Sequence, residues 1–334
     1  MSRRVLVIGK EMNYNLDHYI VRALQKTGNE VKFVGYRDIL GKHYSDTVRM
    51  LWARSKLIRE ISVPIQLKKV NEVYYNLATT LQPDIVLSLK GETLLPAYIK
   101  KIRKDVGSKT MLWYPDDPRF FGSLAKHISP HYDVVFTSSQ NAISLYNKIG
   151  VTNVHRLPFA CDPEVHNDKE AEHFRINKAL FIGTFSFGRY KFIKELIRSG
   201  IPIDLIGSKW PATLSKYVVS HAIFGKQYVS ALRSYSVVLN IHQEINYGPN
   251  MRTFETTGSG GLLLSDKAED IATFFDEDRE IQLFDSVDGA RRKIKNIIEG
   301  KGTFNDISTR AMNKCHEKYT YEARAKEILN WAIG

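Results

Sequence analysis

Cysteine is almost missing from this sequence of 334 residues. The two cysteines, Cys161 and Cys315, stand far apart, and neither has further ligands at the spacing of a structural zinc site. Sparse cysteines without a framework are typical of a reduced compartment, which argues against a disulfide-stabilised secreted scaffold. We therefore expect free thiols.

Long apolar runs are also missing. No stretch approaches the roughly 18 apolar residues that a membrane-spanning helix needs. Residues 1–4 lead directly into a strand-like pattern rather than into a signal peptide. These features predict a cytoplasmic protein, either soluble or peripheral at the inner face of the membrane.

Several ligand-binding motifs are absent as well. The turn at Gly9 lacks the further glycines of G-x-G-x-x-G, which disfavours an NAD-dependent enzyme. The adjacent Asp116 and Asp117 do not form a D-x-D motif, and we expect neither a metal nor a cofactor. No helix-turn-helix, zinc finger or aromatic RNA-binding strand is recognisable, which disfavours nucleic acid as a partner.

Positive charge is abundant. The formal net charge is +12, and 43% of the residues are hydrophobic, enough for two domains with real cores. Such a charge favours nucleic acid, an anionic membrane surface or an anionic substrate, with a basic surface that binds nothing as the alternative.

A basic helix is predicted over residues 49–62, ended by Pro64. One of its faces carries Arg49 and Arg59 with Trp52 between them, a combination that suits the headgroup region of an anionic membrane. The alternative is a solvated helix whose Trp52 packs on a neighbouring element.

Short apolar runs alternate with helical spacing along the chain, and this alternation occurs twice. Because buried parallel strands are continuous apolar runs, the pattern predicts two Rossmann-like α/β domains. Residues 158–163 interrupt the regular pattern, and the polar residues 164–178 follow them. The predicted strands are residues 5–9, 31–35, 84–89, 111–114, 133–138, 154–157, 179–184, 203–207, 237–242, 262–264 and 281–284.

The most informative stretch follows the strand predicted over 237–242. A Gly-Pro turn leads into a helix expected from Met251 to Thr257. A helix N-terminus at the carboxyl end of a parallel strand presents unpaired N–H groups and suits a phosphate. Arg252 adds a fork of donors, and Glu255 could accept hydrogen bonds from a ribose diol. This stretch therefore predicts a site for a diphosphate-linked nucleoside.

Residues 250–266, NMRTFETTGSGGLLLSD, resemble the signature of the CgeB-like glycosyltransferases, a GT-B-fold family related to retaining enzymes of the glycogen-synthase type. The resemblance implies two Rossmann-like domains facing an interdomain cleft, with a C-terminal helix that crosses back to the first domain. We expect residues 1–165 and 317–334 to form the acceptor-side domain, and residues 166–316 to form the nucleotide-sugar-binding domain.

The resemblance also implies an activity. We expect a hexosyltransferase that moves a sugar from a nucleoside-diphosphate sugar, with UDP as the favoured nucleotide, without a metal and with retention of configuration. Glu255 occupies the position of the ribose-binding Glu of the larger group. Tyr247 stands where that group often has a second Glu facing the donor sugar, which is a departure from its pattern.

Other candidate residues follow the predicted strands. In the related enzymes, basic residues at the position of Arg189 and Lys191 hold the diphosphate, and the loop that contains Phe224 borders the base. His242 could touch the donor, although a lone histidine there is more often structural. The expected nucleotide-sugar-binding residues are Gly9, Gly183, Thr184, Arg189, Lys191, Gly207, Lys209, Phe224, His242, Tyr247, Asn250, Met251, Arg252 and Glu255.

Catalytic roles are expected for Asp116, Asp117 and Arg252. An acidic loop resembling the one that contains Asp116 and Asp117 faces the cleft in the family, where a carboxylate would orient or deprotonate an acceptor hydroxyl. The alternative is a turn in which an Asp caps the next helix. Arg252 would stabilise charge on the departing diphosphate. Retention follows only from the resemblance, and inversion with an Asp as base stays open.

The acceptor cannot be read from these residues. A basic first domain suits an anionic polymer, a lipid-linked glycan or a phosphorylated surface molecule, with protein and small-molecule acceptors also open. The competing hypotheses are a non-catalytic nucleotide-sugar-binding module, a basic scaffold on membrane or nucleic acid, and an epimerase of GT-B fold.

Overall fold

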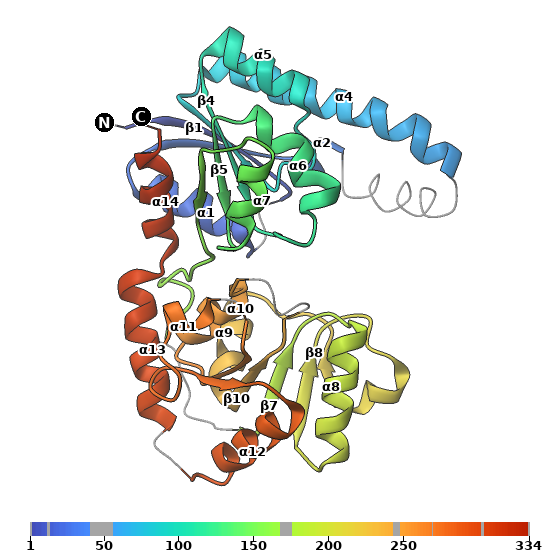
Figure 1. Cartoon of the computed structure of the whole chain (residues 1–334), viewed down its shortest axis with the longest axis vertical. Helices are drawn as coiled ribbons and strands as arrows, with labels where there is room; N and C mark the ends of the chain where they lie inside the picture. Colours follow the sequence, from blue (N-terminus) through green and yellow to red (C-terminus); the bar gives the residue numbers. More distant parts are fainter. Residues whose placement is uncertain are drawn as a thin grey trace. The chain divides into compact units, whose positions relative to one another are not determined.

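The computed structural model describes residues 2–11, 14–40, 56–167, 176–242, 248–268, 270–301 and 304–332, with 56–64 as backbone only. The chain forms two compact units: unit 1 is Met1–Pro158 with Glu322–Gly334, and unit 2 is Phe159–Tyr321 (Figure 1). Each unit is built on one parallel sheet, so the prediction of two α/β domains is confirmed. None of the described helices is long and apolar enough to cross a membrane.

The sheet of unit 1 has six strands in the described part of the chain, in the order β2-β1-β3-β4-β5-β6. All neighbouring strands run parallel. β3 is buried along its whole length, which is why its sequence is an apolar run rather than an alternating pattern. The strands are β1 (Arg4–Gly9), β2 (Glu30–Gly35), β3 (Ile85–Leu89), β4 (Lys109–Tyr114), β5 (Val134–Thr137) and β6 (Val154–Arg156).

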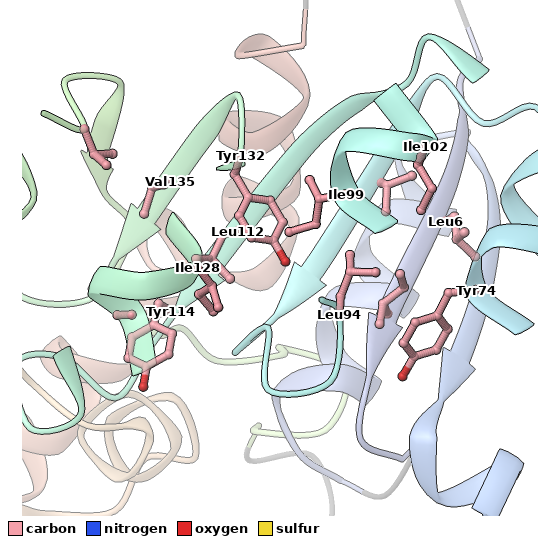
Figure 2. Packing of buried hydrophobic residues seen from close by; sticks show 14 of the residues in the cluster. Leu6, Tyr74, Leu94, Ile99, Ile102, Leu112, Tyr114, Ile128, Tyr132 and Val135 are labelled. Carbon is pink, nitrogen blue, oxygen red and sulfur yellow. The ribbon is translucent and has the colours of Figure 1, made fainter. Parts of the chain in front are cut away.

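Helices cover this sheet, and a continuous apolar core lies beneath two of them. Figure 2 shows Tyr74 from α4 and Ile99 from α5 in the same cluster as the strand residues Leu6, Leu112 and Val135. The helical segments of unit 1 are α1 (Leu16–Lys26), α2 (Tyr36–Leu40), α4 (Lys56–Leu81), α5 (Pro96–Val106), the π-helix η1 (Phe121–Ala125), α6 (Lys126–Ile128), the 3₁₀-helix η2 (Ser129–His131), α7 (Ala142–Lys148) and α14 (Tyr321–Asn330).

The predicted end of a helix at Pro64 is wrong. α4 runs through Pro64 and continues to Leu81. A proline inside a helix removes one backbone donor, but packing of the following turns can outweigh that loss. Here Val70, Tyr74 and Ala78 are buried in the core. Of the residues that carried the membrane prediction, Arg49 and Trp52 lie outside the described residues, and Arg59 lies in the part of α4 that is described as backbone only.

Unit 2 repeats the design with the strand order β12-β11-β10-β7-β8-β9, six strands among its described residues. The strands are β7 (Ile176–Ile182), β8 (Ile203–Ile206), β9 (Val218–Ser220), β10 (Tyr235–Asn240), β11 (Leu263–Asp266) and β12 (Gln282–Phe284). The helical segments are α8 (Phe187–Arg198), the 3₁₀-helix η3 (Ala212–Tyr217), α9 (Gly225–Ser234), α10 (Met251–Gly258), α11 (Ile271–Phe274), α12 (Val287–Ile298) and α13 (Phe304–Lys318).

Residues 304–330 form two helices where a single C-terminal helix was expected. α13 ends at Lys318, and α14 begins at Tyr321. Between these helices, Thr320 forms a β-bridge with Cys161, which lies at the start of unit 2. From Glu322 onward the chain belongs to unit 1, where Trp331 stacks on His155 with ring centroids 3.5 Å apart.

The two cysteines, distant in sequence, are neighbours in unit 2. Both are buried free thiols, as the sequence predicted. The Cys161 Sγ lies 3.9 Å from the carbonyl oxygen of Cys315. The neighbouring Cys315 thiol and burial both raise the pKa of Cys161, which keeps this thiol protonated.

Candidate functional site

The order in which successive strands join the sheet of unit 2 reverses between β7 and β10. From β7 the chain moves through β8 to β9 on one side, and β10 then lies on the other side of β7. Such a switch point leaves a crevice outside the carboxyl ends of the two strands, where open α/β sheets bind ligands. Helix α10, which contains the MRTFETTG part of the motif, follows β10, so its N-terminus lies near this crevice.

Two predicted cations, Arg189 and Arg252, join the ends of these strands. Arg189 follows β7 in sequence, yet its Nε donates to the carbonyl of Ile241 beyond β10, at 2.9 Å. Arg252 follows β10, and its Nη1 donates to the carbonyl of Ile182 at the end of β7. The switch point therefore holds two half-buried guanidinium groups.

A tyrosine connects Arg252 to the predicted ribose ligand, Glu255. The Nε of Arg252 donates to the hydroxyl of Tyr228 at 3.0 Å, and that hydroxyl donates to Glu255 Oε2 at 2.6 Å. Burial alone would lower the pKa of Arg252, but Tyr228 and Glu255 outweigh it and raise this pKa. Arg252 therefore remains a fixed positive charge beside a buried carboxylate.

No sequence motif marks Tyr228, and it was missed. It lies on α9, well before the signature, and its position opposite α10 is set by the tertiary fold. The one signal in the sequence is general: a tyrosine on the buried face of a helix requires a partner for its hydroxyl. Burial raises the pKa of Tyr228, so it stays a neutral donor.

The N-terminus of α10 is capped as an anion site requires. The Asn250 side chain accepts from the N–H of Thr253. The Asn250 side chain also bonds Asn240 at 3.1 Å, which ties the cap to the end of β10. Among the described residues, no acceptor is found for the N–H groups of Met251 and Arg252. Those two donors and the helix dipole are available to a phosphate.

His242 supports this turn through both of its ring nitrogens. Its Nδ1 lies 2.5 Å from Asp266 Oδ1, and its Nε2 accepts from the backbone N–H of Asn250 at 3.2 Å. With both ring nitrogens engaged and the ring buried, His242 positions the α10 cap. These contacts fit the alternative stated above, that a lone histidine at this position is more often structural.

Gly183 and Gly207 let the loops after β7 and β8 cross. Gly207 has φ +149°, and a Cβ there would meet the Gly183 carbonyl oxygen at 2.0 Å. Trp210 Nε1 donates to that same oxygen at 3.1 Å. Glycine is required at position 207 because another backbone fills the space of a side chain.

Four further predicted ligands have side chains that do not join the arginines. Thr184, Lys209 and Phe224 are exposed on loops of unit 2, and Phe224 is 53% accessible. Lys191 lies two residues after Arg189 on α8, about 200° around the helix, and its ammonium sits over the exposed Phe187 ring. Tyr247 lies outside the described residues.

In unit 1, the Gly9 turn already holds an anion. The Asp17 carboxylate accepts from the N–H of Lys10 at 2.6 Å and of Glu11 at 3.2 Å. A Cβ on Gly9 would meet Asp17 Oδ2 at 2.6 Å, so the glycine makes room for this carboxylate. The two backbone donors of the turn are therefore engaged within the protein.

The two predicted catalytic carboxylates have different surroundings. Asp116 is partly exposed and bonds the Lys90 ammonium at 2.6 Å. Asp117 is 1% exposed and accepts from the Tyr146 hydroxyl at 2.7 Å. Burial raises the pKa of Asp117 to about 6, against the hydrogen bond from Tyr146. Of the pair, Asp116 is the carboxylate that is open to solvent.

Metal ligands do not gather in the described residues: no group of three or more His, Cys, Asp or Glu side chains suited to a metal ion is found there. Chemically, the unit 2 site offers two guanidinium groups, two backbone donors and one buried carboxylate. This set matches a diphosphate joined to a group that carries hydroxyls.

Comparison with known sequences gives two related matches. A family model described as glycosyl transferase-like matches residues 189–330. The spore protein CgeB of Bacillus subtilis strain 168 is 24% identical over 181 residues, which cover 52% of this chain and 56% of that protein. The chain therefore spans about half the length of its curated relative.

Comparison with solved structures extends over the whole chain. Sucrose-phosphate synthase from Thermosynechococcus elongatus superposes with a TM-score of 0.69, at 10% identity, over 98% of both chains. HepE of Anabaena, solved with UDP and glucose, gives a TM-score of 0.67 at 9% identity, over 98% of this chain and 99% of that one. The sequence matches make this chain similar to CgeB-like glycosyltransferases, and its two parallel sheets together with these solved structures show the GT-B fold.

Proposed function

We propose that this protein transfers a sugar, a hexose, from a nucleoside-diphosphate sugar to an acceptor, and that unit 2 binds the donor. The observation that carries the proposal is the pair of guanidinium groups at the switch point, each bonded to the end of the opposite strand. Arg252 lies in the first turn of α10, and Arg189 bonds the carbonyl of Ile241, the residue before His242, which contacts the α10 cap. Three sources of positive potential would therefore act on a diphosphate bound there.

Glu255 is proposed to accept hydrogen bonds from the ribose of the donor. The Tyr228 hydroxyl fixes one of its carboxylate oxygens, which leaves the other for a ribose hydroxyl. UDP is the proposed nucleotide because HepE, which shares the fold, was solved with UDP. The base would lie near the loops that contain Lys209 and Phe224.

In the proposed reaction, the bond between the anomeric carbon and the diphosphate breaks. The negative charge that develops on the leaving oxygen is stabilised by Arg189, Arg252 and the α10 dipole, without a metal. Retention of configuration is proposed from the family resemblance. Asp116 is the carboxylate proposed to orient the acceptor hydroxyl, because Asp117 is buried.

Arg252→Ala tests the role of the switch-point cation. We expect turnover of a UDP-sugar, measured as UDP release, to fall at least tenfold because one stabilising charge on the leaving group is lost. Arg252→Lys keeps the positive charge but lacks the forked guanidinium, so its turnover should lie between those of the wild type and Arg252→Ala. This variant separates the effect of the charge from that of the hydrogen bonds to Ile182 and Tyr228.

The matched control is Arg291→Ala, a partly exposed arginine of the same unit paired with Asp288 on α12. Its turnover should equal that of the wild type. Unchanged turnover in folded Arg252→Ala would refute the assigned role. NMR of the product's anomeric proton would decide retention against inversion.

A further inference from the structure

The positive charge of the chain is concentrated in unit 1. Counted over the sequence, unit 1 has 26 Lys and Arg against 15 Asp and Glu, a net charge of +11. Unit 2 has 22 against 21, a net charge of +1. A diphosphate site in unit 2 therefore does not account for the excess, which points to an anionic partner of unit 1.

Much of this charge is displayed by two neighbouring helices, α4 and α5, which pack together and lie side by side in Figure 1. Each helix places residues at i, i+3, i+4 and i+7 on its outer face. On α4 these are Ile65, Lys68, Lys69 and Glu72, and on α5 they are Ala97, Lys100, Lys101 and Lys104. We call the five lysines the α4–α5 lysine face.

Two carboxylates between the helices accept hydrogen bonds from tyrosine hydroxyls. Glu72 accepts from the Tyr98 hydroxyl at 2.5 Å, and Asp105 accepts from the Tyr75 hydroxyl at 2.8 Å. Lys101 lies over the Tyr75 ring, 3.7 Å from its centroid. All five lysines are exposed, and within the described residues none of them forms an ion pair.

Some surface lysines elsewhere in the described residues are paired with carboxylates. In unit 2, Lys293 pairs with Glu277 and Asp278, and Lys295 and Lys301 pair with Glu299. Five lysines stand beside two carboxylates, Glu72 and Asp105, so the α4–α5 lysine face is a net positive surface, and its charge attracts an anionic counterpart from solution.

The composition of the face favours a lipid surface over a nucleic acid. Its cationic side chains are lysines, and the neighbouring Arg103 of α5 is engaged with Asp133 at 2.6 Å. Fixed phosphates are recognised by arginine forks, whereas flexible lysine stems suit mobile headgroups. Ile65, 65% exposed on the same face, would enter the boundary between headgroups and acyl chains.

We infer that unit 1 docks on the surface of an anionic lipid bilayer through the α4–α5 lysine face. This inference uses side chains outside the proposed donor site and does not depend on the proposed reaction. Each lysine near an anionic surface contributes about 1 kcal/mol, so the loss of two corresponds to about a 25-fold weaker partition.

Vesicle flotation of the full-length protein tests the inference. We expect binding to vesicles of phosphatidylglycerol and phosphatidylcholine in equal parts, little binding to phosphatidylcholine alone, and release at roughly 1 M salt. K100Q/K104Q should weaken the partition about 25-fold. Ile65→Ser should weaken vesicle binding several-fold while leaving any binding to random DNA unchanged.

The matched control is K216Q/K318Q, which removes the same charge from two exposed lysines of unit 2. Equal losses in both double variants would show a dependence on net charge alone and overturn the inference. So would an absence of vesicle binding by the wild type, or binding to DNA without binding to vesicles. Circular dichroism confirms that each variant is folded.

Discussion

Tyr228 is the residue through which the cation and the carboxylate of the unit 2 site are joined. Its hydroxyl is both an acceptor from Arg252 and a donor to Glu255. The guanidinium and the carboxylate are thus held apart by one oxygen and cannot collapse into a direct ion pair. The separation leaves each group free to meet a different part of a nucleotide.

Tyr228→Phe removes this oxygen. We expect the dissociation constant for UDP, measured by calorimetry, to rise about tenfold, and the free energy of unfolding to fall by about 2 kcal/mol, since two charged groups lose a partner. Tyr235→Phe is the control, because it loses a comparable bond from its hydroxyl to Asp204 within the same unit. It should lower stability and leave UDP affinity unchanged; an equal effect on affinity would contradict the role of Tyr228.

Asp117 gives a prediction for the dependence of stability on pH. Its pKa is raised by burial from 3.8 to about 6, so the folded state binds a proton more tightly than the unfolded state. Its contribution to stability is therefore greatest below about pH 4 and is lost as the pH rises through 6, by about 3 kcal/mol in total. Asp117→Asn should remove this dependence, measured by urea unfolding from pH 4 to 7. Parallel curves for the two proteins would show that Asp117 does not titrate in this range.

At the scale of elements, the crossing of the loops after β7 and β8 depends on a single missing side chain. Gly207→Ala would place a methyl group 2.0 Å from the Gly183 carbonyl oxygen, at a φ of +149°. Backbone strain and overpacking together should lower the free energy of unfolding by about 3 kcal/mol or more. Gly188→Ala is the control, since nothing lies within 4 Å of a Cβ at that position. A fully stable Gly207→Ala protein would show that the two loops can separate.

The elements themselves were largely predictable, and the reason is local. β3 and β4 are buried on both faces, so their apolar runs are visible without knowledge of their neighbours. The continuation of α4 past Pro64 was not predictable, because the local cost of the proline is outweighed by Tyr74 and its neighbours in a core assembled from distant strands.

The candidate site divides in the same way. Asn250, Arg252 and Glu255 belong to one contiguous motif whose spacing fixes a cap and two faces of a short helix, so a sequence can suggest them. Tyr228 lies on another helix, and the burial of Asp117 depends on Tyr146 of α7. Contacts of this kind form only once the elements have packed. The nucleotide-binding roles remain predictions for the experiments above.

For the whole molecule, the last helix is part of a unit begun by the first strand. Ala325 and Ile328 of α14 are fully buried, and Arg324 Nε donates to the Pro158 carbonyl at 3.0 Å. Deleting residues 322–334 should therefore destabilise unit 1 and spare unit 2. We expect faster hydrogen exchange in β5 and β6, while UDP still raises the melting temperature of unit 2. Trp331→Ala, which loses the stack on His155, should give a smaller effect of the same kind. Equal loss of protection in both units would contradict this assignment.

The placement of α14 also bears on how the protein is made. The strands of unit 1 are translated first, yet the helix that completes this unit is translated only after the whole of unit 2. Unit 2, whose residues 159–321 are contiguous, can fold while unit 1 still exposes apolar surface. Newly made chains that stall before residue 322 should thus be cleaved by proteases preferentially within residues 1–158, which belong to unit 1.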